Sequence, residues 1–261
     1  MKKEINWLLR EKYNGKPSKA FEKDVKRLKN GEPVDYVIGF TEFLGCKIDL
    51  SKKTLIPRPE TEFWAGVEIE KLKNLLKIEN CKLKIRCLDM FAGSGCIGIA
   101  ILKHIKNVIV VFADKDKKCL EQIKINLEIN GVKNNFIVRQ SDVFSGFTRQ
   151  KLKHLSGRGF DLVFANPPYI PIKNKYQIQE SVLKYEPNGA LFGGGDGLFY
   201  INKFLRDARL HLNPNGKIFM EFDGSAAQKR EIEKLLKNYK YRSWKFHKDQ
   251  FGKPRWIMLF F

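Results

Sequence analysis

The stretch Asp89-Met90-Phe91-Ala92-Gly93-Ser94-Gly95 indicates the fold class, because it lies where an apolar strand pattern over residues 85–89 changes into a helical pattern. Three further strands are predicted at 108–113, 135–140 and 160–165, and helical patterns separate the first three of the four strands. Strands that alternate with helices in this way form parallel β-α-β units. We therefore predict an α/β fold built on a doubly wound parallel sheet.

The C-terminal part of the chain extends this pattern. We predict a helix at 196–212, a strand at 216–222, a serine-capped helix at 225–238, and two strands at 241–247 and 255–261. The connection between the last two strands is too short for a helical crossover. We therefore expect these two strands to form an antiparallel pair at the edge of the sheet.

The N-terminal part predicts a smaller unit. Residues 1–30 carry two short helical patterns, and residues 36–56 alternate apolar and polar side chains around Gly39 and Gly45, as a hairpin would. A further helical pattern follows at 61–76. We divide the chain into a short helical N-terminal region (1–30), a hairpin and linker (31–62) and an α/β domain (63–261).

Composition and charge place few limits on the partner. The chain has 261 residues, 43% of them hydrophobic, and no apolar run approaches the roughly 18 residues that a membrane-spanning helix needs. A formal net charge of +20 suggests a nucleic-acid neighbourhood, but lysines spread along the whole chain fit a solvated surface about as well. The five cysteines show no metal-type spacing and indicate reduced, mostly buried thiols. We expect a cytoplasmic protein.

Residues at the ends of the first three strands suit a nucleoside ligand. The glycines of the 91–95 turn let the backbone approach a ligand closely, and Asp114 can accept hydrogen bonds from both hydroxyls of a ribose. Asp142 can accept from an adenine amino group and Val143 can cover the ring, although both also fit a turn. Asp116 is interpreted as a helix cap. Because the turn is neither G-x-G-x-x-G nor a phosphate-binding lysine loop, S-adenosylmethionine fits better than a dinucleotide or ATP.

The stretch Asn166-Pro167-Pro168-Tyr169 follows the fourth strand and places two hydrogen-bond acceptors there. Proline fixes its own φ and restricts the residue before it, so the Asn166 side chain and the Pro167 carbonyl are held in place. One acceptor for each N–H of a planar NH2 group would orient its nitrogen toward an electrophile. This pattern favours methylation of an NH2 nitrogen, although Asn-Pro and Pro-Pro are also ordinary turn signals.

Several short motifs accompany this stretch from about residue 31 to the C-terminus. They are Gly31-Glu32-Pro33 with Tyr36 and Gly39, Leu55-Ile56-Pro57-Arg58-Pro59-Glu60-Thr61-Glu62, Tyr185-Glu186-Pro187, Ala190-Leu191 and Gly194-Gly195-Asp196-Gly197-Leu198. With Asn166-Pro167-Pro168-Tyr169, they make the chain resemble the HemK/PrmC protein-(glutamine-N5) methyltransferases. Members of that family modify the glutamine of the Gly-Gly-Gln motif in peptide chain release factors.

The resemblance implies a Rossmann-like class I methyltransferase that uses S-adenosylmethionine and takes a release factor as its partner. The catalytic residues that it implies are Asn166, Pro167, Pro168 and Tyr169, and Arg58 and Glu186 join these four in binding substrate. Together with the strand-end argument, it predicts cofactor binding by Phe91, Ala92, Gly93, Ser94, Gly95, Asp114, Asp142, Val143 and Asn166. We expect a monomer that needs no metal, no membrane and no nucleic acid.

Two departures from the family and three alternatives accompany this interpretation. Phe91 stands where the family usually has glycine, so its side chain must pack against the ligand or a neighbouring helix. The N-terminal region is shorter than the helical bundle that helps the family dock release factors.

The alternatives are an adenine-N6 methyltransferase, a ribosomal-protein glutamine methyltransferase and a non-catalytic cofactor- or RNA-binding protein. The run over residues 58–62 favours the release-factor branch.

Overall fold

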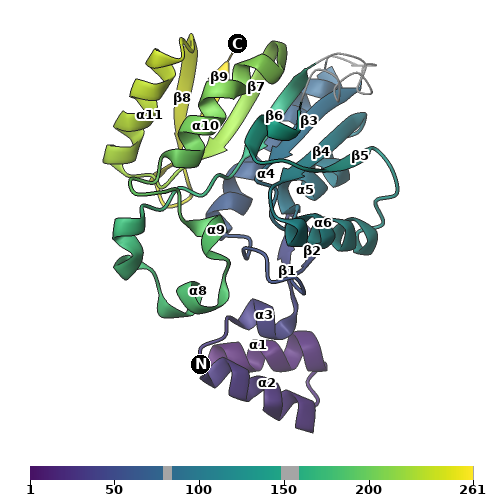
Figure 1. The fold of residues 1–261 in the computed structure, drawn as a ribbon. Coiled ribbons are helices and arrows are strands. Elements are labelled where there is room, and N and C mark those ends of the chain that lie inside the picture. Colours follow the sequence, from purple (N-terminus) through teal and green to yellow (C-terminus); the bar gives the residue numbers. More distant parts are fainter. Residues whose placement is uncertain (79–83, 148–158, 261) are drawn as a thin grey trace.

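A seven-stranded sheet forms the centre of the computed structural model, which describes residues 1–78, 84–147 and 159–260 (Figure 1). The strand order is β5-β4-β3-β6-β7-β9-β8. The strands are β3 (Ile85–Met90), β4 (Val108–Asp114), β5 (Phe136–Gln140), β6 (Phe160–Ala165), β7 (Leu212–Glu221), β8 (Ser243–Lys248) and β9 (Pro254–Phe260). The first five run parallel, and β9 pairs antiparallel with both β7 and β8. The predicted α/β fold class is confirmed.

Side-chain alternation along the central strands divides the interior into two cores. In β6, Leu162 and Phe164 pack into one core, whereas Val163 and Ala165 pack into the other, because successive strand residues point to opposite faces. Helices α4 (Pro59–Ile78), α5 (Cys96–His104) and α6 (Lys117–Ile129) cover the first face, and α10 (Phe199–Ala208) and α11 (Ala226–Asn238) cover the second (Figure 1). Both faces of the sheet are therefore buried, as parallel strands require.

The C-terminal elements follow the sequence prediction except at their ends, since α10 ends at Ala208 rather than at 212 and β8 begins at Ser243 rather than at 241. Helix α10 begins at Phe199 rather than at 196, because the Asp196 side chain accepts the Leu198 N–H and closes a turn before the helix. Strand β7 begins at Leu212, directly after the short 3-10 turn η4 (Arg209–His211), instead of at 216. The predicted serine cap is confirmed, since the Ser225 hydroxyl accepts the Gln228 N–H at 3.0 Å. The antiparallel C-terminal pair is also confirmed, and position 261 lies outside the described residues.

The N-terminal helices α1 (Lys2–Tyr13) and α2 (Lys19–Lys29) are joined by a third helix, α3 (Val34–Ile38), at the lower end of the molecule in Figure 1. All three contribute to one small core, which contains Leu8, Leu28 and Val37. The sequence pattern over 36–56 indicated that the hairpin would already have begun in this segment. Because α3 packs with α1 and α2, we propose that the helical N-terminal region extends to Ile38, beyond the boundary at residue 30.

The hairpin predicted around Gly45 is confirmed. Strands β1 (Phe40–Phe43) and β2 (Cys46–Asp49) pair antiparallel, and both residues of their tight turn, Leu44 and Gly45, have positive φ angles of 48° and 73°. The Glu62 carboxylate accepts the Leu44 N–H at 2.7 Å, which ties the turn to the start of α4. The hairpin and α4 thus fix the linker between them, residues 50–58, beside the carboxyl edge of the large sheet.

The described residues also form the short elements η1 (Val143–Gly146), η3 (Ile172–Gln177), α8 (Glu180–Tyr185) and α9 (Asn188–Leu191). None of the helices in the described parts of the chain is long and apolar enough to cross a membrane. The thiols of Cys46, Cys87, Cys96 and Cys119 are buried and free, as expected, and Cys81 lies outside the described residues.

Candidate active site

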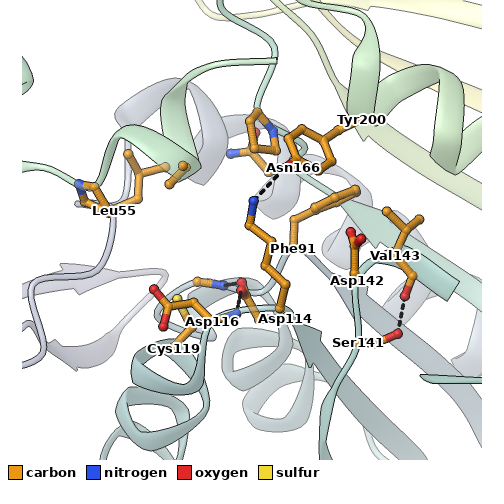
Figure 2. A pocket seen from close by; sticks show the side chains of 16 residues that line it. Leu55, Phe91, Asp114, Asp116, Cys119, Ser141, Asp142, Val143, Asn166 and Tyr200 are labelled. Carbon is orange, nitrogen blue, oxygen red and sulfur yellow. Dashed lines mark hydrogen bonds between the residues drawn. The ribbon is translucent and has the colours of Figure 1, made fainter. Parts of the chain in front are cut away.

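A cavity opens where β3, β4, β5 and β6 end, the edge at which α/β sheets bind ligands. Its wall consists of Leu55, Phe91, Gly93, Asp114, Lys115, Asp116, Cys119, Ser141, Asp142, Val143, Asn166, Pro168, Pro187, Gly189, Ala190 and Tyr200. We call it the cofactor cavity. Figure 2 shows Asp114 and Asn166 on opposite sides of this space, with Asp142 and Val143 beside Phe91. The three strand ends that the sequence singled out are thus brought together.

A second cavity adjoins the first. It is lined by Leu55, Arg58, Asn166, Pro167, Tyr169, Ile170, Ile178, Gln179, Val182, Ala190 and Leu191, and we call it the substrate cavity. Leu55, Asn166 and Ala190 line both cavities. The four residues of the Asn-Pro-Pro-Tyr stretch are divided between them, because Pro168 faces the cofactor cavity and Pro167 and Tyr169 face the substrate cavity.

Asp114 holds its carboxylate at the cofactor cavity through two backbone contacts. Oδ2 accepts the Gly93 N–H and Oδ1 accepts the Asp116 N–H, each at 2.9 Å. Burial raises the pKa of Asp114, and these two N–H groups partly oppose that shift. Each carboxylate oxygen keeps further lone-pair capacity, so the carboxylate is oriented while it can still accept from a ligand. Asp116 caps α6 as predicted, accepting the Lys118 N–H at 2.9 Å.

The glycine turn contributes less of the cavity wall than the sequence suggested. Phe91 and Gly93 line the cavity, whereas Ala92, Ser94 and Gly95 do not. Ser94 is buried, and its carbonyl accepts the Asn126 side-chain N–H at 2.9 Å. A Cβ at Gly95 would lie 3.0 Å from the Ile123 side chain, so this glycine permits close packing of α5 against α6.

Phe91 adopts a left-handed conformation with φ 60°, which is costly for a residue with a side chain. Its ring centroid lies 6.1 Å from those of Tyr200 and Phe204, both on α10. Of the two surroundings expected for this side chain, packing against a neighbouring helix is therefore observed. The Lys115 ammonium donates to the Tyr200 hydroxyl at 2.6 Å, and both residues line the cavity.

The third strand end forms a tight loop. Val143 has φ 54°, an uncommon value for a β-branched residue, and the Ser141 hydroxyl closes the loop by donating to the Val143 carbonyl and accepting the Gly146 N–H. Ser141, Asp142 and Val143 all line the cofactor cavity. The Asp142 carboxylate also forms an ion pair with Lys203 of α10, with 2.5 Å between Oδ2 and Nζ.

Asn166 belongs to a buried hydrogen-bond network that the sequence did not reveal. Its Nδ2 donates to the Thr61 hydroxyl at 3.3 Å, and this hydroxyl donates to Oε2 of Glu221 at 2.7 Å. The Trp64 indole donates to the same Oε2 at 2.6 Å, and the Tyr169 hydroxyl donates to Oε1 at 2.9 Å. One carboxylate therefore connects α4 with both ends of the Asn-Pro-Pro-Tyr stretch. We call these five residues the Glu221 network.

Glu221 is 1% exposed, so its charge depends on these donors. Burial raises the pKa of Glu221, and the hydrogen bonds from Thr61, Trp64 and Tyr169 together with the Arg255 charge act in the opposite direction. Burial next to this carboxylate also raises the pKa of the Tyr169 hydroxyl well above its ordinary value. The sequence carried one usable signal, because Glu221 is an acidic residue that directly follows the apolar run Ile218-Phe219-Met220 at the end of β7.

Arg58 and Glu186 come together as an ion pair, with 2.6 Å between Nη2 and Oε1. The other Glu186 oxygen accepts the Ile56 N–H at 3.1 Å. Arg58 lines the substrate cavity, whereas the buried Glu186 does not. In this arrangement Glu186 orients Arg58 and the linker.

None of the described histidines belongs to the wall of either cavity. His104 bonds the Leu44 carbonyl, His211 stacks on Phe144, and His247 stacks on Trp256; none of the three lines either cavity. His154 lies outside the described residues. The described residues contain no group of three or more histidine, cysteine, aspartate or glutamate side chains able to hold a metal ion.

Comparisons with known proteins identify relatives of this chain. A family model described as conserved hypothetical protein 95 matches residues 70–203. The release factor glutamine methyltransferase of Lactococcus lactis subsp. lactis is 35% identical over 258 residues, covering 97% of this chain and 87% of that protein. The protein of the same name from Flavobacterium psychrophilum is 32% identical and covers 90% of this chain and 78% of its own length. The N-terminal domain of human METTL16 in complex with SAH has a similar fold, with a TM-score of 0.57 at 17% identity over 83% of this chain and 76% of that chain.

The fold and the cavity at the carboxyl edge of the sheet define a class I, Rossmann-like methyltransferase that depends on S-adenosylmethionine. The chain belongs to the release factor glutamine methyltransferase family. The family, fold class and cofactor predicted from the sequence are thereby confirmed.

Proposed function

We propose that this chain transfers a methyl group from S-adenosylmethionine to the side-chain amide nitrogen (N5) of the glutamine in the Gly-Gly-Gln motif of peptide chain release factors. The observation that carries the proposal is that the cofactor and substrate cavities meet at Asn166. A methyl donor in one cavity and an amide in the other would therefore face each other across one side chain. The names of the relatives supply the class of protein that carries the amide.

The residues of the cofactor cavity fit an adenosyl cofactor. The oriented carboxylate of Asp114 suits two ribose hydroxyls, and Leu55 and Val143 offer apolar surface for an adenine ring. Asp142, which also lines the cavity, is our candidate acceptor for the adenine amino group. When bound, S-adenosylmethionine supplies an electrophilic methyl group on a sulfonium centre.

Orientation of the substrate amide is the task that we assign to the Asn-Pro-Pro-Tyr stretch. An amide nitrogen is a poor nucleophile because its lone pair is delocalised into the carbonyl. Asn166 Oδ1 and the Pro167 carbonyl would each accept one N–H of the glutamine amide, which aims the nitrogen at the cofactor cavity. The same two acceptors stabilise the positive charge that grows on nitrogen during transfer. Tyr169, in the wall of the substrate cavity, would lie against the glutamine side chain.

One proton must leave the nitrogen after the methyl group has been transferred. None of the three described histidines lines either cavity, and the Glu221 carboxylate is occupied by three side-chain donors. We therefore assign the final proton transfer to water. The enzyme contributes geometry and electrostatic stabilisation, with no strong base among these residues.

Arg58 and the linker that Glu186 holds lie on the rim of the substrate cavity. We propose that this rim contacts the backbone around the Gly-Gly-Gln motif and that the N-terminal helices provide a further docking surface. Because release factors work in translation, we place the reaction in the cytoplasm, and we expect one copy of the chain to suffice.

The decisive experiment is transfer of a radiolabelled methyl group from S-adenosylmethionine to a purified release factor. Labelling of the Gly-Gly-Gln protein and none of a Gly-Gly-Ala variant is the expected result. Equal labelling of both proteins would remove glutamine from the proposal. Parallel assays with DNA, RNA and ribosomal proteins test the alternative substrates, and preferential labelling of any of them would replace the release factor.

A further inference from the structure

We propose that Glu221 is a positioning residue which, acting through Thr61, fixes the orientation of the Asn166 side-chain amide so that its oxygen faces the substrate. This inference rests on the proposed function, since it concerns how the acceptor for the glutamine amide is oriented. Glu221 lines neither cavity, so its carboxylate would act on the substrate only through neighbouring side chains.

The strand register places Glu221 beside the motif. Strands β6 and β7 are parallel, and Ala165 is the register partner of Met220. Asn166 directly follows β6 and Glu221 is the last residue of β7, so the two residues lie side by side at the carboxyl edge of the sheet. Thr61, in the first turn of α4, lies between the two side chains and bonds both of them.

The direction of each hydrogen bond follows from counting protons. The Trp64 indole N–H can only donate, so Oε2 of Glu221 is an acceptor in that contact. The same carboxylate oxygen has no proton to donate, so it also accepts from Thr61. The Thr61 hydroxyl therefore donates its only proton to Glu221. Only lone pairs then remain on the Thr61 oxygen. The group of Asn166 that faces Thr61 must be the NH2 group.

The opposite orientation of the Asn166 amide would be unfavourable on both sides. It would turn the amide oxygen toward the lone pairs of Thr61 and would present an NH2 group to the NH2 group of the substrate. With the NH2 group held by Thr61, Oδ1 is free to accept from glutamine. Glu221 also accepts the Tyr169 hydroxyl, so the same carboxylate holds the other end of the motif.

The test compares Thr61→Val with Thr61→Ser. Valine keeps the shape of threonine but lacks the hydroxyl, whereas serine keeps the hydroxyl and loses only a methyl group. We expect Thr61→Val to lower kcat on the order of tenfold, the effect of one lost hydrogen bond, with the KM for release factor and the affinity for S-adenosylmethionine unchanged. Thr61→Ser should retain kcat. A normal kcat in Thr61→Val, or an equal loss in both variants, would overturn the proposal.

Glu221→Gln supplies a second test. Its amide oxygen can still accept from Thr61 and Trp64, and its NH2 group can donate to the Tyr169 oxygen, whose hydroxyl then points elsewhere. We expect kcat within a few-fold of wild type. If Glu221→Gln lost activity while Thr61→Val kept it, the carboxylate would act by its charge and not by orienting Asn166.

A readout independent of catalysis separates this inference from the proposed function. The side-chain 15N–1H signals of Asn166 can be assigned by their loss in Asn166→Ala. Their exchange with water should be slow in wild type and Thr61→Ser and faster in Thr61→Val. Absence of methyl transfer to the Gly-Gly-Gln protein would refute the proposed function alone, whereas equal exchange in all three proteins would refute the role of Thr61 and Glu221.

Discussion

The guanidinium of Arg58 and the carboxylate of Glu186 lie 2.6 Å apart, although 128 positions separate them in the sequence. The contact joins the linker that precedes α4 to the end of α8. Since the second Glu186 oxygen bonds the Ile56 N–H, one buried carboxylate fixes both the linker backbone and the arginine side chain. The rim of the substrate cavity is therefore built before any substrate arrives.

Loss of this contact should weaken binding of the release factor. In Glu186→Ala, Arg58 loses its ion-pair partner and the Ile56 N–H loses its acceptor. We expect the KM for release factor to rise about tenfold. The effect is limited to this size because Arg58 is partly exposed and solvent screens its ion pair. Steady-state methyl transfer measures this effect. The control is Asp207→Ala, which breaks an ion pair with the neighbouring Arg206 away from both cavities and should leave KM unchanged. A KM in Glu186→Ala that matched this control would contradict the role of the rim.

Asn166→Ala should reduce turnover far more than cofactor affinity. The substitution removes one of the two acceptors that orient the amide, and removal of a single preorganised group of this kind costs about 100-fold in kcat. Calorimetry should find nearly unchanged affinity for S-adenosylmethionine, because the other residues of the cofactor cavity remain. Unchanged turnover would exclude Asn166 from the orienting role.

Asp114→Ala should weaken S-adenosylmethionine binding. Hydrogen bonds to a charged group are worth about 1.5–3 kcal/mol, which corresponds to an affinity loss of roughly 10- to 100-fold. Because Asp114 also holds the Gly93 and Asp116 N–H groups, Asp114→Asn is the matched variant, which keeps one acceptor and the side-chain volume. We expect an intermediate affinity for it by calorimetry. Wild-type affinity in Asp114→Ala would remove this residue from the cofactor site.

Asp89 should make stability depend on pH. Burial raises the pKa of this carboxyl from its ordinary value of 3.8 to about 8. The folded protein therefore keeps a proton that the unfolded chain loses near about pH 4. The contribution of Asp89 to the free energy of unfolding is full below about pH 4. It declines by about 1.4 kcal/mol for each pH unit as the pH rises toward about 8.

Asp89→Asn removes this titration but leaves an oxygen for the Gly98 N–H, which Asp89 accepts at 2.9 Å at the start of α5. Urea unfolding at about pH 5 and about pH 8 should show a smaller loss of stability in the variant than in wild type. Parallel losses in the two proteins would indicate that Asp89 is ionised in the folded state.

Gly98→Ala should destabilise the fold through crowding. A Cβ at this position would lie 2.2 Å from Cε1 and 2.8 Å from Cζ of Phe112, a buried ring of β4. Overpacking of this kind typically costs about 1–3 kcal/mol. Gly195→Ala is the control, because a Cβ there would meet no atom within 4 Å. Equal midpoints of denaturation for the two variants would show that the ring moves aside at little cost.

The sequence allowed us to predict those candidate site residues whose place in the fold follows from the strand that they end or directly follow. Asp114, Val143 and Asn166 each lie at or shortly after the carboxyl end of a predicted strand, and the carboxyl ends of parallel strands meet at one edge of the sheet. Glu221 could not be assigned in the same way, because its role depends on Thr61 and Trp64, which reach it from a helix far away in the sequence.

Two other features limited prediction from the sequence: very short helices and the packing of turn residues against neighbouring elements. Helix α3 has five residues, too few for a helical period to stand out from the alternating pattern that follows it. The turn after β3 was recognised by its glycines, yet spacing alone could not separate Gly93, which faces the ligand cavity, from Gly95, which faces Ile123. Lys115 and Tyr200 were missed because their contact depends on how α10 lies over the sheet.

The wall that Leu55, Asn166 and Ala190 share between the two cavities has a consequence for inhibitor chemistry. One molecule that joins an adenosyl group to a glutamine-like amide through a short tether can occupy both cavities at once. Once its first half is bound, the second half meets its cavity at an effective concentration in the millimolar range. Bisubstrate compounds built to cross this wall should discriminate against methyltransferases that share only the cofactor cavity.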